Sequence, residues 1–76
     1  MGNPSDDERL QRAFGKRLAD LRRSRHLTQG QLGERANLSM GTIGKIETGK
    51  RWVSLGTLDA LAKALEVDID ELFWGL

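Results

Sequence analysis

Side chains suited to binding another molecule gather between residues 29 and 51. This stretch combines an amide, hydroxyls, a methionine and cations: Gln29, Ser39, Met40, Thr42, Lys45, Lys50 and Arg51. A lysine can donate to guanine or to a phosphate, a threonine to a phosphate, and a methionine can pack against a thymine methyl group. Residue types of this kind suit a surface that binds nucleic acid.

Other kinds of chemistry have little support in the sequence. The chain of 76 residues has no cysteine and a single histidine, His26, so no disulfide or zinc site is expected. No Ser/His/Asp or Cys/His set stands out, and the glycines are not gathered in a phosphate-binding loop. We therefore expect no enzyme, no metal, no cofactor and no small-molecule substrate, and we expect His26 in an exposed loop.

Charge is segregated along the chain, although the net charge is only +1. Residues 1–8 carry −3, residues 9–51 carry eleven Lys/Arg against three acids for +8, and residues 52–76 carry −4. A basic block between acidic ends favours a polyanion as partner, and an unevenly charged solvated surface is the alternative.

The chain contains no apolar stretch of about 18 residues, the length that a membrane-spanning helix needs. Its first residues lack the apolar core of a signal peptide. We expect a single domain over residues 1–76 in the cytoplasm, with a flexible tail at residues 1–5 and a core over about 6–74.

Helical periodicity predicts an all-α fold of five helices. The first is expected from about Asp6 to about Arg25, with a capping box at Ser5 to Glu8. Its apolar residues recur at helical spacing and should form one buried stripe, made of Leu10, Phe14, Leu18 and Leu21.

Two short helices follow in close succession. Thr28 and Gln31 form a second capping box, and this helix should run to about Ala36. Asn37 tolerates a left-handed backbone, and Ser39 should cap a third helix that ends near Thr48, with Gly49 as its stop. Such tight spacing is typical of a helix-turn-helix, with a generic helical corner as the alternative.

The last quarter of the chain should form a fourth helix capped by Ser54 and a fifth opened by Asp68, with Glu71 supporting the cap. Leu72, Phe73 and Trp74 cannot all point inward from this fifth helix. These three residues are expected to form a two-fold dimer contact, which would cover Trp74, and a Trp74 folded back on the core of the same chain is the alternative.

Residues 14–73 resemble the Cro/C1-type helix-turn-helix family of phage repressors and bacterial XRE-like regulators. The matching positions are Phe14-Gly15-Lys16-Arg17-Leu18, Leu27-Thr28-Gln29, Gln31-Leu32, Ala36-Asn37-Leu38-Ser39, Ile43-Gly44-Lys45-Ile46-Glu47-Thr48-Gly49, Ser54-Leu55, Leu58, Leu61-Ala62-Lys63-Ala64-Leu65 and Glu71-Leu72-Phe73. The segment from Arg51 to Phe73 is also similar to restriction–modification controller proteins.

The resemblance implies a five-helix domain whose third helix reads DNA in the major groove. It further implies a repressor or controller protein that binds near-palindromic operators as a homodimer, with half-sites roughly 34 Å apart. Residues implied to face the bases or the adjacent backbone are Ser39, Met40, Gly41, Thr42, Gly44 and Lys45. Residues implied to contact phosphates are Gln29, Lys50 and Arg51, with Arg17 on the first helix as a weaker candidate. A structural ion pair between Arg22 and Glu47 is also implied.

Gly41 and Gly44 depart from the family pattern, which usually has larger polar residues there. A glycine inside a helix costs about 1 kcal/mol relative to alanine. Two explanations stay open at this point: the glycines let the helix backbone approach the groove, or DNA shape supplies more of the specificity. Met40 likewise has a second interpretation, as a surface or gap-filling residue.

The alternative function is an antitoxin or protein-interaction module that masks a partner protein. The acidic, apolar C-terminal end favours it. A segment that wraps a partner is expected of an antitoxin, and only Gly75 and Leu76 follow Trp74.

Overall fold

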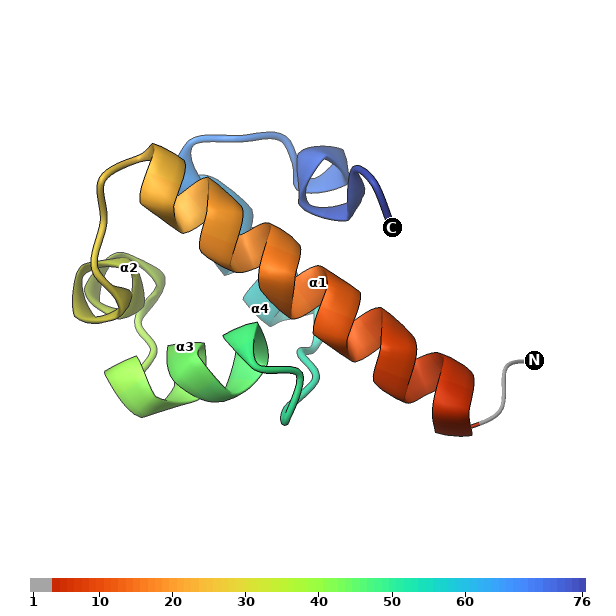
Figure 1. Cartoon of the computed structure of the whole chain (residues 1–76). Helices are drawn as coiled ribbons and strands as arrows, with labels where there is room; N and C mark the ends of the chain where they lie inside the picture. Colours follow the sequence, from red (N-terminus) through yellow and green to blue (C-terminus); the bar gives the residue numbers. More distant parts are fainter. Residues whose placement is uncertain (1–3) are drawn as a thin grey trace.

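The computed structural model describes residues 4–76, which form four α-helices and one 3-10 helix (Figure 1). The elements are α1 (Pro4–Ser24), α2 (Gln29–Ala36), α3 (Met40–Glu47), α4 (Leu55–Leu65) and η1 (Ile69–Phe73). No strand occurs within this described range, so the predicted all-α class is confirmed. No helix in the same range is long and apolar enough to cross a membrane.

Helix α1 begins at Pro4, two residues earlier than predicted. Proline suits the first turn of a helix because the amide hydrogen that it lacks has no partner there anyway. The predicted flexible tail is therefore wrong for residues 4 and 5, which are helical. The rest of that tail and the capping role of the Ser5 side chain fall outside the described part.

The predicted caps of α2 and α3 are confirmed. The Gln31 amide donates to Thr28 Oγ1 at 3.0 Å, and the Thr28 amide donates to Gln31 Oε1 at 2.8 Å. Asn37 ends α2 in the left-handed conformation, with φ 60°. The Ser39 hydroxyl then accepts from the Thr42 amide at 3.0 Å and starts α3. These local bonds fix the sharp turn between α2 and α3 (Figure 1).

The end of α3 and the start of α4 also agree with the sequence. Gly49 has φ 75° just after α3, and the Ser54 hydroxyl accepts from the Thr57 amide at 3.2 Å. His26 lies exposed in the loop between α1 and α2, as predicted.

The prediction of a fifth helix is corrected in two respects. It forms a five-residue 3-10 helix rather than an α-helix, and Asp68 makes no capping bond with its side chain. A segment this short gains little from α-helical propagation, so 3-10 geometry is usual for such pieces. Its place is set by tertiary contacts, above all by the fully buried Leu72.

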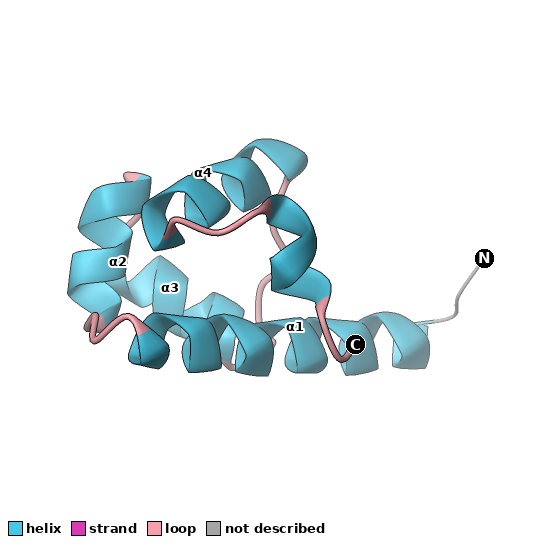
Figure 2. Ribbon diagram, turned by 90° about the horizontal axis from the view of Figure 1, so that it is seen from above, coloured by secondary structure: helices cyan, strands magenta, loops and turns pink. Residues whose placement is uncertain are grey.

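The core lies between α1, the α2–α3 corner and α4. Its largest fully buried side chains are Phe14, Leu18, Leu32, Ile43, Ile46, Leu61, Leu65 and Leu72. Leu10 was predicted to belong to this core and is instead 38% exposed. The cause is that the first turns of α1 project beyond the other helices (Figures 1 and 2).

A glycine allows α1 and α3 to cross closely. A Cβ atom at Gly15 would collide with the backbone carbonyl groups of Ile46 and Glu47. Gly33 plays the same part in the corner, where a Cβ would collide with the Leu38 carbonyl oxygen. Both glycines are thus required by packing, and they fix the position of α3 on the surface.

Candidate nucleic-acid interface

Helix α3 is anchored on one side and open on the other. Ile43 and Ile46 are 0% and 1% exposed and hold the helix against the core. The opposite face presents Met40, which is 63% exposed, together with the exposed Ser39, Gly41 and Lys45. Thr42 and Gly44 lie half-buried along its edges. The structure therefore brings all six residues predicted for the third helix onto one short element.

The two hydroxyl groups at the start of α3 hydrogen-bond to each other. Ser39 Oγ donates to Thr42 Oγ1 at 2.8 Å while it accepts from the Thr42 amide. At the other end, Thr48 Oγ1 donates to the Gly44 carbonyl oxygen at 2.9 Å. These bonds stiffen an eight-residue helix that would be marginal in isolation.

Gln29 lies against the edge of α3 that contains Gly44. Its Nε2 donates to Glu47 Oε1 at 3.0 Å, and its amide group is 3.7 Å from the place of a Cβ atom at Gly44. Gln29 is also the first residue of α2, where backbone amides without helical partners suit an anion. The side chain thus connects the start of α2 to the face of α3.

The ion pair implied for Arg22 and Glu47 is present in the structure. Arg22 Nε donates to Glu47 Oε2 at 2.7 Å and Nη2 to Oε1 at 3.1 Å, while Nη1 donates to the Leu27 carbonyl oxygen at 2.8 Å. The hydrogen bond to Glu47 raises the pKa of Arg22, against the opposing effect of burial. The charged guanidinium therefore fastens α1 to the end of α3 and to the loop before α2.

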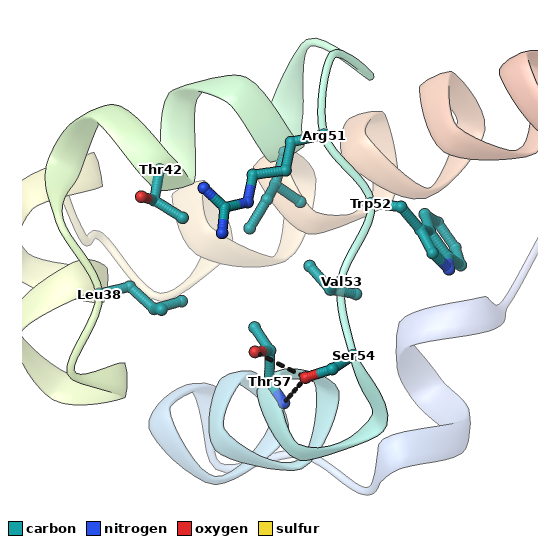
Figure 3. A pocket seen from close by; sticks show the side chains of 8 residues that line it. Leu38, Thr42, Arg51, Trp52, Val53, Ser54 and Thr57 are labelled. Atoms are coloured by element: carbon teal, nitrogen blue, oxygen red, sulfur yellow. Dashed lines mark hydrogen bonds between the residues drawn. The ribbon is translucent and has the colours of Figure 1, made fainter.

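Arg51 follows α3 and lies beside the candidate interface. Figure 3 shows its side chain extended along the space between Thr42 on α3 and the Ser54–Thr57 cap at the start of α4. Arg51 and Lys50 are both exposed. The backbone amide of Lys50 donates to the Lys45 carbonyl oxygen at 2.9 Å, which ties this segment to the last turn of α3.

Arg17 does not belong to this surface, and its predicted phosphate contact is corrected. Its Nε donates to the Glu71 carbonyl oxygen at 2.9 Å, and its guanidinium carbon lies 5.6 Å from the centroid of the Trp74 ring. These partners belong to η1 and the residue after it, on the side of α1 opposite to α3 (Figure 1). Arg17 instead fastens the C-terminal segment to α1.

The predicted dimer residues divide into one core residue and two surface residues. Leu72 is 0% exposed, so it cannot offer surface to a partner, and this prediction is corrected. Phe73 is 39% and Trp74 60% exposed, and the Phe73 ring centroid lies 5.7 Å from that of Phe14. The sequence analysis missed Ile69 and Leu76, which are also exposed here. Both residues are apolar and belong to a segment that is too short to bury every side chain, and this pattern could have predicted their exposure.

Gly30 is a third residue that was not predicted from the sequence. A Cβ atom there would lie 3.9 Å from the sulfur atom of Met40, so the second residue of α2 adjoins the first residue of α3. Its position could have drawn attention to it, because Gly30 and Gly41 each stand two residues after the capping residue of their helix. Only the fold shows that the two are neighbours of the same methionine.

Comparison with known proteins identifies the family. A helix-turn-helix family model (HTH_3) matches residues 18–72. The immunity repressor protein of Bacillus phage phi105 is 41% identical over 58 residues, which are 76% of this chain and 40% of that protein. The HTH-type transcriptional activator BcrR of Enterococcus faecalis is 39% identical over 62 residues, which are 82% of this chain and 30% of that protein. The chain thus spans less than half the length of these two curated relatives.

Among solved structures, the restriction-modification controller protein C.AhdI from Aeromonas hydrophila superposes with a TM-score of 0.87 at 37% identity. That alignment covers 90% of this chain and 99% of the controller protein. The family model contains α2, α3 and α4 in full, together with the end of α1 and most of η1. The chain therefore belongs to the Cro/C1-type helix-turn-helix family of DNA-binding transcriptional regulators.

Proposed function

We propose that residues 1–76 form one DNA-binding domain that recognises near-palindromic operators as a homodimer. Helix α3 enters the major groove of each half-site, and Lys45 donates to a guanine or to a phosphate beside it. The observation that carries this proposal is that α3 has one buried face and one exposed face. Its isoleucines are buried while Met40, Gly41 and Lys45 face outward.

Groups on both sides of α3 are proposed to hold the DNA backbone. Gln29 and the free amides at the start of α2 contact a phosphate on one side. Lys50 and Arg51 contact phosphates on the other side, where the Arg51 side chain extends toward Thr42 (Figure 3). Contacts of this kind position the protein on the duplex and carry no sequence information themselves.

The homodimer is proposed to form through the exposed apolar residues of the C-terminal segment. Ile69, Phe73 and Trp74 are 42%, 39% and 60% exposed and lie within six consecutive residues. Helix η1 lies on the other side of α1 from α3, so a partner docked there leaves α3 free (Figure 1). A two-fold contact at one patch uses the same surface from both subunits.

Selection of bound sequences from a random DNA pool tests the proposal, followed by fluorescence anisotropy on the selected operator and on a scrambled duplex. We expect a near-palindromic consensus and binding to the operator at least about a thousandfold tighter than to the scrambled duplex. Lys45→Ala should weaken binding and relax the preference at one position of each half-site.

Two results would contradict the proposal. One is a Lys45→Ala variant with unchanged affinity and unchanged sequence preference. The other is a protein that shows no preference among sequences at low salt but binds one partner protein stoichiometrically, as a module that masks a partner would.

A further inference from the structure

The polar side chains around the start of α3 are engaged within the protein. Ser39 and Thr42 hydrogen-bond to each other at 2.8 Å, and Gln29 Nε2 donates to Glu47 at 3.0 Å. Lys45, the cation of this face, stands in the last turn of the helix. The outermost side chain of the first turn is therefore an apolar one, Met40, and it is 63% exposed.

Met40 stands between two glycines. Its sulfur atom is 3.9 Å from the place of a Cβ at Gly30, and a Cβ at Gly41 would meet only Ser39 Oγ, at 4.0 Å. Among the described residues, the glycines with positive φ are Gly49 and Gly75, so no unusual backbone angle requires glycine at positions 30 and 41. Neither packing nor conformation explains glycine at these two positions.

This arrangement does not fit a methionine that fills a gap. A gap-filling methionine is surrounded by core side chains, whereas this side chain projects from α3 with open space at Gly41. In the major groove, the apolar feature of a base edge is the C5 methyl group of thymine. The exposed thioether of Met40, with glycines near it at positions 30 and 41, matches the apolar character of that methyl group.

We propose that Met40 reads the C5 methyl group of a thymine in each half-site, and that Gly30 and Gly41 keep the space through which the duplex approaches it. The proposal rests on the proposed function, because it assigns a base contact to the helix that enters the groove. It adds an apolar, methyl-specific contact to the hydrogen bonds that Lys45 can donate.

Operator duplexes in which one thymine of each half-site is replaced by deoxyuridine test the proposal, since uracil differs from thymine only by this methyl group. Binding is measured by anisotropy for the wild-type protein and for the variants Met40→Ala, Met40→Leu and Lys45→Ala, with circular dichroism to check folding. For the wild-type protein we expect one thymine position at which uracil weakens binding about fourfold per half-site, the effect of about 0.8 kcal/mol for one buried methyl group.

The variants distinguish the contribution of Met40 to methyl recognition from the contribution of Lys45 to binding. Met40→Ala should bind the thymine and uracil operators equally, and Met40→Leu should keep most of the discrimination. Lys45→Ala should bind every duplex more weakly and keep the fourfold ratio. Discrimination that persists in Met40→Ala would overturn the proposal. So would a wild-type protein that prefers its operator over scrambled DNA but responds to no uracil, a result that leaves the proposed function intact. A protein without any preference for the operator would refute both.

Discussion

Arg22 on α1 and Glu47 at the end of α3 form a two-point ion pair, with N–O distances of 2.7 and 3.1 Å. Their side chains are only 10% and 5% exposed. Glu47 also accepts from Gln29 at 3.0 Å, so one carboxylate links three helices. Loss of this carboxylate would leave a buried guanidinium without its counter-charge.

Glu47→Ala should therefore lower the free energy of unfolding by about 3–5 kcal/mol. The measurement is urea denaturation followed by circular dichroism. The matched control is Asp59→Ala, which removes the partner of Lys63 in a pair whose side chains are 77% and 56% exposed. That variant should change stability by less than about 1 kcal/mol. Equal unfolding midpoints for the two variants would show that the buried pair contributes no more than a surface pair.

Gly15→Ala should destabilise the fold by about 1–3 kcal/mol, because its Cβ would collide with the Ile46 carbonyl where α1 crosses α3. Gly44→Ala is the control on α3, since its Cβ would make an ordinary contact of 3.7 Å with the Gln29 amide group. A gain of up to about 1 kcal/mol in helix propensity is expected for Gly44→Ala. Thermal unfolding should thus move in opposite directions for the two substitutions. A Gly15→Ala variant as stable as the wild-type protein would contradict the close crossing.

Gly41→Ala should leave the fold intact and weaken operator binding about tenfold, which is about 1.4 kcal/mol. The added methyl group has open space in the free protein and would project toward the duplex. Gly44→Ala should bind within about threefold of the wild-type protein, because its methyl group lies against Gln29. Anisotropy on the selected operator measures both. Equal binding by the Gly41→Ala variant and the wild-type protein would mean that α3 does not approach the groove at this point.

Arg51→Ala should lower the slope of log affinity against log salt by about 0.9, the effect of one lost phosphate contact on duplex DNA. Arg17→Ala removes the same charge and should leave the slope unchanged, because Arg17 is bound to Glu71 and lies beside Trp74. The two variants are compared by anisotropy over a range of salt concentrations. A lower slope for Arg17→Ala alone would reverse the assignment of these two residues.

Trp74→Ala should raise the dimer dissociation constant at least about tenfold, since large aromatic residues contribute most of the energy of an interface. Sedimentation equilibrium measures the effect. Leu55→Ala serves as the control, because Leu55, at 81%, is the most exposed large apolar side chain among the described residues and lies at the start of α4. A wild-type protein that sediments as a monomer at high concentration would contradict a dimer through this segment.

Local sequence patterns were sufficient to predict most of the secondary structure, including α3. The caps at Thr28, Ser39 and Ser54 are confirmed, because each depends on bonds within four residues. The spacing of Ile43 and Ile46 likewise predicts which face of α3 is buried, since three residues make nearly one helical turn.

What the sequence determined by itself, then, are the caps of α2, α3 and α4, the turn between α2 and α3 and the inner face of α3, because these depend on neighbouring residues. The tertiary structure alone decided that Leu10 is exposed, that Leu72 is core, that Arg17 binds the C-terminal segment and that Gly30 adjoins Met40. Helical periodicity gives the direction of a side chain but not whether another element lies there. A long cation can reach any partner that the fold brings near. Contacts between residues distant in the chain therefore fixed these positions.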